Sequence, residues 1–276
     1  MTLSEMRQIL SDRDIQLTKS LGQNFLHDGN QLRRIVDAAD LAPDDNVLEI
    51  GPGLGPLTEL LIEKSAHVLA VEMDKRLVTF LEKRFDTPKL ELFHSDGLQV
   101  ARDKSRDWSN WKLVANLPYS IASPILVELA ENPSAPQGMT VTLQIEVAQR
   151  IQSKAGDANY GLLSLLLQLR YEPLGWFKIP AASFFPAPDV DSACISLRLR
   201  SKPLLPIDQL QKFKRIVKKA FSERRKMMMK LLKQEWPAEN LTNAFQKIGL
   251  SPQIRAEAVT LEQFVALTTC LTSDPR

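Results

Sequence analysis

The sequence predicts an α/β protein with a doubly wound parallel sheet, followed by a small helical domain. Residues 47–55 read Val-Leu-Glu-Ile-Gly-Pro-Gly-Leu-Gly, an apolar run that ends in an acid and a glycine-rich turn. Short apolar runs and segments of helical period then alternate along the chain, a pattern typical of βαβ units. Residues 201–206 have the composition of a linker, and only helical patterns follow them. We therefore expect a Rossmann-like domain over residues 1–200 and a helical domain over residues 207–276.

Composition excludes several classes of protein. The chain has 276 residues, of which 44% are hydrophobic and 25% are charged, as is ordinary for a globular protein. No apolar run reaches the roughly 18 residues of a membrane span, and residues 1–20 lack the apolar core of a signal peptide. The two cysteines make no disulfide framework, and the three scattered histidines lack metal-ligand spacing. We expect a cytoplasmic monomer with no metal site and no membrane contact.

Positive charge is concentrated in one segment. Residues 212–233 hold ten Lys or Arg and one acid, so this segment carries +9 and the rest of the chain −7, although the net charge is only +2. Such asymmetry favours a nucleic acid as partner for this segment, and a solvated helix face is the alternative. The residues that we expect to contact RNA phosphates are Lys214, Arg215, Lys218, Lys219, Arg224, Arg225 and Lys226.

The first elements follow from periodicity and turn chemistry. Residues 1–20 are polar, and we expect them to be loosely ordered until they dock on the rest of the chain. A helix is expected to begin at Asp28, because apolar residues recur at helical spacing after it. An apolar strand over 46–50 leads into the glycine turn, where the backbone can approach a ligand closely. The next helix, over 56–64, begins at Pro56, whose missing N–H is harmless at the first helical position.

Two acids follow the next two strands. Residues 67–71 predict a strand that ends at Glu72, 21 residues after Gly51. A carboxylate at that place can accept both ribose hydroxyls of a nucleoside, and an ordinary surface Glu is the alternative. Residues 90–93 predict a strand just before Asp96, whose carboxylate can accept from the exocyclic amine of adenine.

A dinucleotide site is the competing interpretation of the glycine turn. The dinucleotide fingerprint is Gly-x-Gly-x-x-Gly, whereas here Gly51, Gly53 and Gly55 form Gly-x-Gly-x-Gly. With Glu72 and Asp96 behind it, the turn looks more like that of a class I S-adenosylmethionine-dependent methyltransferase than that of a dehydrogenase.

The stretch Asn116-Leu117-Pro118-Tyr119 follows a fourth apolar strand. It resembles the Asn/Asp-Pro-Pro-Tyr motif of methyltransferases that act on amino nitrogens of adenine or cytosine. Such a nitrogen is a poor nucleophile because its lone pair is delocalised into the ring. The Asn116 side-chain oxygen and the Leu117 carbonyl can accept its two N–H bonds, and Tyr119 offers a face on which the extruded base can stack. A plain turn after a buried strand is the alternative.

Periodicity also predicts the later elements. Residues 162–169 fit a helix or a buried strand, and we choose the helix. We interpret the three methionines at 227–229 as core filler. The other expected elements are helices over 123–130, 146–153, 213–221, 240–248 and 261–271 and strands over 141–145, 176–179 and 193–199.

Taken together, the motifs are similar to those of the rRNA adenine N6-dimethyltransferase family, and in particular to its bacterial small-subunit branch. The resemblance covers about residues 18–268. One position departs from it, because Ile145 stands where the family usually has Lys, which weakens any phosphate contact there. The motifs that carry the resemblance are residues 22–26 (Gly-Gln-Asn-Phe-Leu), 49–55, 116–119, 143–150, 160–164, 184–192 (Phe-Phe-Pro-Ala-Pro-Asp-Val-Asp-Ser) and 220–226.

The resemblance implies a cofactor, a target and roles for single residues. The cofactor is S-adenosylmethionine, and the target is N6 of two adjacent adenosines near the 3′ end of 16S rRNA in the small ribosomal subunit. Phe184 is expected to stack on the target base opposite Tyr119, although without the resemblance a core aromatic would be favoured. The residues implied to hold the cofactor are Asn24 and Leu26 at its methionine end, Gly51 beside it, Glu72 at the ribose, Asp96 at the adenine and Asn116 between cofactor and base.

Two rivals remain within this fold. The related methyltransferases that act on 23S rRNA share the N-terminal motifs, but residues 184–192 and 220–226 favour the small-subunit branch. A ribosome-assembly factor without catalysis could also use the same fold. The intact 116–119 motif and Glu72 argue against such a factor, because a pure binding module has no need of the complete site.

Overall fold

The computed structural model describes residues 1–12, 23–223 and 225–271, and the chain divides into two compact units. The first unit comprises residues 1–148 and 172–199, and the second comprises residues 149–171 and 200–276. The segment 149–171, which we assigned from the sequence to the first domain, groups with the second unit. The reason is packing, because its apolar side chains Tyr160 and Leu165 are buried in the same core as the C-terminal helices.

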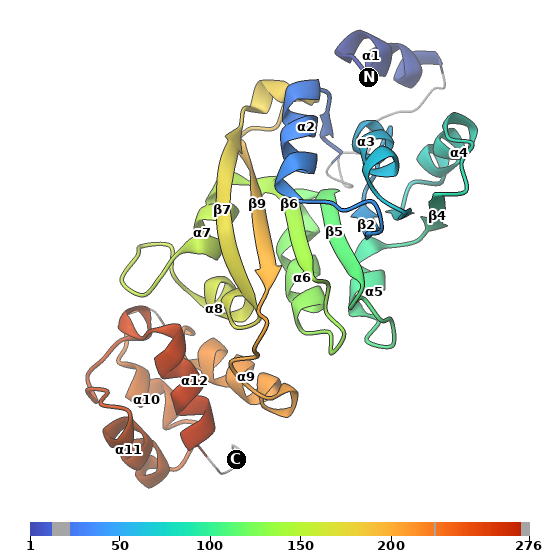
Figure 1. The fold of residues 1–276 in the computed structure, drawn as a ribbon. Helices are drawn as coiled ribbons and strands as arrows, with labels where there is room; N and C mark the ends of the chain where they lie inside the picture. The colour runs from blue at the N-terminus through green and yellow to red at the C-terminus, as the bar shows by residue number, and fades with distance from the viewer. Residues whose placement is uncertain (13–22, 224, 272–276) are drawn as a thin grey trace. The chain divides into compact units, whose positions relative to one another are not determined.

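A seven-stranded sheet forms the centre of the first unit (Figure 1), in the order β4-β3-β2-β5-β6-β9-β7. Neighbouring strands from β4 through β6 are parallel, and β9 pairs antiparallel with β6. The predicted doubly wound α/β fold is therefore confirmed. The strands are β2 (Asn46–Ile50), β3 (His67–Glu72), β4 (Leu90–His94), β5 (Trp111–Asn116), β6 (Gly138–Gln144), β7 (Tyr171–Ile179) and β9 (Ser192–Leu199).

Helices cover both faces of this sheet. Val47 and Val68 pack against α2 and α3 on one face. Ile50 points to the opposite face because side chains alternate along a strand, and there it meets the start of α5 at Gly97. The helices up to the end of the parallel strands are α1 (Leu3–Asp12), α2 (Gly29–Ala38), α3 (Pro56–Lys64), α4 (Lys75–Arg84), α5 (Gly97–Arg102), α6 (Tyr119–Ala130) and α7 (Ile145–Gln152).

Side-chain caps begin two of these helices. The Asp28 carboxylate accepts hydrogen bonds from the backbone N–H groups of Asn30 and Gln31 at the start of α2. Asp74 does the same for the N–H of Arg76 at the start of α4. Each cap satisfies N–H groups that have no partner within the helix. Pro56 occupies the first turn of α3, as predicted.

A second, two-stranded sheet joins segments far apart in the sequence. β1 (Phe25–Leu26) pairs antiparallel with β8 (Phe184–Phe185), so that Phe25 faces Phe185 and Leu26 faces Phe184. The His27 N–H extends the pairing by donating to the Ser183 carbonyl over 3.0 Å. The N-terminal segment is thereby fixed to the loop that precedes β9.

The first N-terminal residues are helical and docked. Residues 3–12 form the helix α1, whereas residues 13–20 of the segment expected to be loosely ordered until docked lie outside the described residues. Met6 and Leu10 attach the helix, because both are buried in a cluster with Leu77 and Leu81 of α4. Two apolar residues four positions apart form one face of a helix, a signal that the polar composition concealed.

Several elements begin earlier than predicted, among them α6 and β7. α6 begins at Tyr119, directly after Pro118, and accommodates Pro124 in its interior, whereas the expected start was Ser123. β7 begins at Tyr171 and includes Pro173, whereas the expected strand covered only its second half. A proline is tolerated there because β7 is the edge strand of the sheet, where an N–H on the outer side has no partner to lose.

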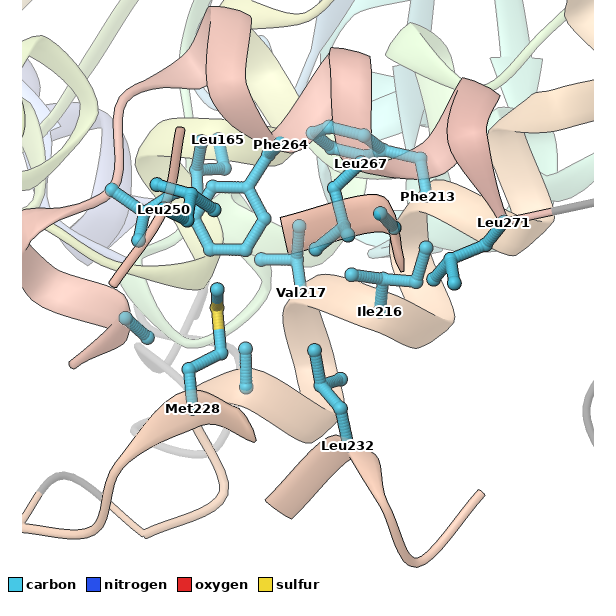
Figure 2. Close-up of a cluster of buried hydrophobic side chains, with 14 of the residues drawn as sticks. Leu165, Phe213, Ile216, Val217, Met228, Leu232, Leu250, Phe264, Leu267 and Leu271 are labelled. Carbon is cyan, nitrogen blue, oxygen red and sulfur yellow. The ribbon is translucent and has the colours of Figure 1, made fainter. Parts of the chain in front are cut away.

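The second unit is helical around its own apolar core, shown in Figure 2. Phe213 and Val217 of α9 meet Phe264 of α12 there. Met228 and Met229 are buried in this core, as predicted, whereas Met227 is 42% exposed. No described helix of the two units is long and apolar enough to cross a membrane. The helices of the second unit are α8 (Leu162–Gln168), α9 (Leu210–Ala220), α10 (Met228–Leu232), α11 (Ala238–Lys247) and α12 (Leu261–Cys270).

Candidate active site

A cavity of about 260 Å³ lies where the parallel strands of the first unit end. Its wall includes Gly51 after β2, Glu72 at the end of β3, Asp96 after β4 and Asn116 at the end of β5. Asn24 lines it from the N-terminal segment. The strand order reverses between β2 and β5, and ligands of doubly wound sheets bind at such a reversal. The structure thus brings together five of the six residues predicted to hold the cofactor.

The glycine turn depends on the absence of side chains. Gly51, Gly53 and Gly55 have φ angles of 74°, 61° and 81°, in the region that favours glycine. A Cβ atom on Gly53 would lie 2.6 Å from the ring of Phe25, which also lines the cavity. The backbone at Gly53 is therefore open to a ligand on one side and packed against an aromatic ring on the other.

Glu72 is a buried carboxylate held by backbone donors. Its Oε1 accepts from the N–H groups of Met73 (2.8 Å) and Asp74 (2.9 Å), and its Oε2 accepts from that of Gly53 (3.2 Å). Burial raises the pKa of Glu72, and the three N–H donors counteract that rise. The side chain is therefore oriented before any ligand arrives, and it ties the end of β3 to the glycine turn.

Asp96 caps helix α5. Its Oδ1 accepts from the N–H of Leu98 over 2.8 Å, and a carboxylate has further acceptor capacity for a ligand. Gly97 allows the close approach of α5 to β2, since a Cβ atom there would collide with the side chain of Ile50. The carboxylate is thus fixed at the cavity wall by its own helix.

The 116–119 motif is placed at the cavity by β5 and α6. Asn116 donates from Nδ2 to the carbonyl of Asn24 over 3.0 Å, which fixes the orientation of its amide. Asn116 Oδ1 is buried and accepts no hydrogen bond within the described part of the chain. The Leu117 N–H donates to the carbonyl of Thr142 over 3.1 Å, and Pro118 is the N-cap residue of α6. The motif therefore presents an unused acceptor in a fixed direction.

Tyr119 is the first residue of α6, and it also lines the cavity. Its hydroxyl forms a hydrogen bond of 2.5 Å with Ser192 Oγ at the start of β9. Burial raises the pKa of Tyr119, so the phenol stays neutral at physiological pH.

Two predicted site residues lie in the core and not at the cavity wall. Leu26 is 2% exposed and Phe184 is 3% exposed, and both belong to the apolar cluster that covers one face of the sheet. Their pairing in the β1–β8 sheet accounts for this, because it turns both side chains to the same buried side. Phe184 is thus a core aromatic in this structure, the alternative that residue-level reasoning favoured.

One residue of the cavity wall and one buried acid near it received no role from the sequence. Gln23 lines the cavity, and its Nε2 donates to Asp74 over 3.3 Å. Glu49 is fully buried in β2, and burial together with the nearby charge of Glu72 raises its pKa to about 8. The signal for Glu49 was available, since it is an acid inside an otherwise apolar strand that is buried on both faces.

The basic residues of the second unit are engaged to different degrees. Arg215 forms an ion pair with Glu235 at 2.7 Å, and Lys219 approaches the same carboxylate at 3.6 Å. Lys226 pairs with Glu223 at 2.6 Å, and Lys214 is half-buried. Lys218 and Arg225 are exposed, whereas Arg224 lies outside the described residues. The predicted basic face is therefore partly neutralised by acids of its own unit.

Comparison with known proteins identifies the family. Residues 15–273 match the sequence profile described as "Ribosomal RNA adenine dimethylase". The chain belongs to this family. It is 40% identical over 261 residues to "Ribosomal RNA small subunit methyltransferase A" of Geobacter metallireducens, covering 92% of this chain and 95% of that protein. The protein of the same name from Protochlamydia amoebophila is 40% identical over 271 residues, with 96% and 94% covered.

Solved structures agree with the fold. The crystal structure of the 23S rRNA methyltransferase ErmE has a TM-score of 0.67 and 28% identity, covering 91% of this chain and 100% of that one. A dimethyladenosine transferase from Plasmodium falciparum has a TM-score of 0.70 at 24% identity, covering 88% and 95%, and shows the fold alone. The fold is that of the class I methyltransferases, as predicted.

S-adenosylmethionine is the cofactor of this family of methyltransferases, and the cavity fits it. The turn at Gly53 has no room for a Cβ atom, Glu72 and Asp96 are carboxylates held by backbone N–H donors, and Asn116 Oδ1 is an acceptor without a partner in the described chain. These features provide close backbone approach and several hydrogen-bond acceptors within one cavity.

The contact between Gly53 and Phe25 gives a first prediction. Gly53→Ala should weaken the binding of S-adenosylmethionine by about tenfold or more, because the new methyl group must displace the Phe25 ring. Isothermal titration calorimetry measures the dissociation constant.

Gly249→Ala is the matched control, because Gly249 has a similar φ of 71° but no atom within 4 Å of the added Cβ. Both variants lose stability through backbone strain, which thermal unfolding measures. Equal cofactor affinity of the two variants would contradict the role of the Phe25 contact.

Burial of Glu49 gives a second prediction, which concerns stability and pH. The pKa of Glu49 is about 8 in the folded chain and near 4.5 in the unfolded chain, so between these values the folded state binds more protons. The free energy of unfolding should therefore fall as pH rises from about 5 to about 8. Glu49→Gln should remove this loss, so that its stability relative to wild type increases with pH. Urea denaturation at several pH values measures the difference, and a pH-independent difference would contradict the assignment.

Proposed function

We propose that the protein transfers methyl groups from S-adenosylmethionine to N6 of two adjacent adenosines near the 3′ end of 16S rRNA, during biogenesis of the small ribosomal subunit. The names of the relatives support the subunit, and the name of the family supports the base. Such a substrate implies a cytoplasmic protein. We propose that it acts as a monomer.

The observation that carries this proposal is the buried, unused acceptor of Asn116 at the cavity wall. The Asn116 amide is held by its bond to Asn24, so Oδ1 has one direction available. A buried acceptor without a partner costs free energy unless a ligand supplies a donor. An adenine N6 group has two N–H donors, and we assign one of them to Asn116 Oδ1 and the other to the Leu117 carbonyl.

The chain's part in the chemistry is orientation and electrostatics. When bound, S-adenosylmethionine supplies a methyl group on a positively charged sulfur. Asn116 and Leu117 hold both N–H bonds of the amine, which favours a pyramidal nitrogen with its lone pair available. Tyr119 offers its ring as the stacking face for the extruded base. Because Phe184 is buried, the proposal relies on Tyr119 for this contact.

Methyl transfer to ribosomal particles tests the proposal and gives a third prediction. Labelled S-adenosylmethionine and unmethylated small subunits should yield N6-dimethyladenosine in 16S rRNA. Asn116→Ala should lower kcat by roughly 100-fold or more, because the amine loses a preorganised acceptor. Asn46→Ala is the control: Asn46 is at the opposite end of the neighbouring strand β2, far along the sheet from the cavity, and should leave the rate unchanged.

Assays with other substrates distinguish the proposed function from a 23S rRNA methyltransferase and from an assembly factor without catalysis. Label on 23S rRNA alone would move the activity to the large subunit, a test prompted by the 28% identity to ErmE. No label on either RNA, together with tight binding to small subunits, would favour an assembly factor without catalysis. Mass spectrometry of the digested RNA identifies the modified base in each case.

We also propose that the basic residues of the second unit bind rRNA phosphates. Lys218 and Arg225 are the strongest candidates, because both are exposed and form no ion pair among the described residues. Arg215 and Lys219 contribute less, since Glu235 holds their charge in a local ion pair. Phosphate contacts add affinity that decreases steeply with salt, because bound counterions are released.

A fourth prediction follows for RNA binding. The double variant Lys218→Ala/Arg225→Ala should bind RNA more weakly than wild type. The negative slope of log K against log [salt] should become shallower by about 2, because two phosphate contacts are lost. Lys247→Ala is the control, because Lys247 is exposed on α11 outside the basic segment. Filter binding of small-subunit rRNA at several salt concentrations measures both. An unchanged slope would remove these two residues from the interface.

A further inference from the structure

The hydroxyl of Tyr119 is held by a residue to which the sequence analysis gave no role. Tyr119 O–H and Ser192 Oγ are 2.5 Å apart, although the residues are 73 positions apart in the sequence. Ser192 is fully buried at the first position of β9. The buried serine hydroxyl needs a hydrogen-bond partner, and the partly buried phenol of Tyr119 provides it.

The position of Ser192 is fixed by the surrounding backbone. Ser192 pairs with Gln144 at the end of β6, and the carbonyl of the preceding residue, Asp191, accepts from the N–H of Ile145 over 3.1 Å. The Asp191 carboxylate accepts from the N–H of Ala181 (2.9 Å) and pairs with Lys178 (2.6 Å). Ser192 Oγ is therefore attached to a part of the sheet that is held on both sides.

Tyr119, in contrast, occupies the first position of a helix at the cavity wall. A tyrosine ring has two side-chain torsions, and a face that is to receive a base must be held in one orientation. Packing at a cavity is incomplete, so the hydroxyl bond supplies a constraint that the apolar contacts of the ring lack. The bond also connects the 116–119 motif with the start of β9.

We propose that Ser192 is a positioning residue for methyl transfer, which it serves by holding the Tyr119 ring in the orientation that receives the target base. This inference rests on the proposed function, since it assigns Tyr119 the stacking face. Ser192 acts through Tyr119 and touches neither base nor cofactor.

Kinetics of methyl transfer to unmethylated small subunits test the inference and give a fifth prediction. Ser192→Ala should lower kcat at saturating substrates by about tenfold, the effect of one lost hydrogen bond that orders a reacting group. The dissociation constant for S-adenosylmethionine should stay within about twofold of wild type. Ser192→Thr, which retains the hydroxyl, should restore most of the rate.

A double-mutant cycle with Tyr119→Phe isolates the bond. This variant keeps the ring and removes only the hydroxyl, so it tests the bond even if Ser192→Ala folds poorly. The effects of the two substitutions should not add, because both remove the same interaction. Ser196→Ala is the control: Ser196 is a hydrogen-bonded serine on the same strand, 3.1 Å from the carbonyl of Ala38, and it should leave kcat unchanged.

Three outcomes would overturn the inference, and they differ from failure of the proposed function. Wild-type kcat in Ser192→Ala would exclude a positioning role, and so would additive effects in the cycle. A loss of kcat that follows only the fall in melting temperature, with no rescue by Ser192→Thr, would indicate a purely structural role. If the wild type itself methylates no adenosine, the proposed function fails first.

Discussion

The reversal of strand order between β2 and β5 is the constraint on which the site depends. Parallel pairing of β2 with both β3 and β5 brings the ends of these strands to one edge of the sheet. The connections after β2 and β5 then diverge to opposite sides, and the space between them becomes the cavity. Glu72 and Asn116, 44 positions apart in the sequence, line one cavity only because of this pairing.

A second constraint is the contact between the N-terminal segment and the glycine turn. The ring of Phe25 occupies the space that a side chain at Gly53 would fill, so the cavity is closed by a residue that belongs to β1. Because β1 pairs with β8, the same segment also holds the loop before β9. The cavity wall and the loop between β8 and β9 are thereby both attached to one small sheet.

Local features of the site could be predicted from the sequence, and long-range pairings could not. Gly51, Glu72 and Asp96 each follow an apolar strand, so their place at the sheet edge follows from βαβ topology. Phe184 was assigned to the cavity, but its register with Leu26 depends on a partner 158 positions away. Arg215 was assigned to phosphate contact, because Glu235, 20 positions away, gave no local sign of pairing with it.

The two buried acids show how the site keeps one carboxylate available as an acceptor. Glu72 receives three backbone N–H bonds, which favour its charged form against burial. Glu49 lacks such donors, and Glu49 Oε2 accepts no hydrogen bond from the described residues, so burial holds it in the neutral form at neutral pH. Two charges so close would repel each other and raise the pKa of Glu72 further. Protonation of Glu49 removes that repulsion, and the three N–H donors hold Glu72 as an oriented acceptor at the cavity wall.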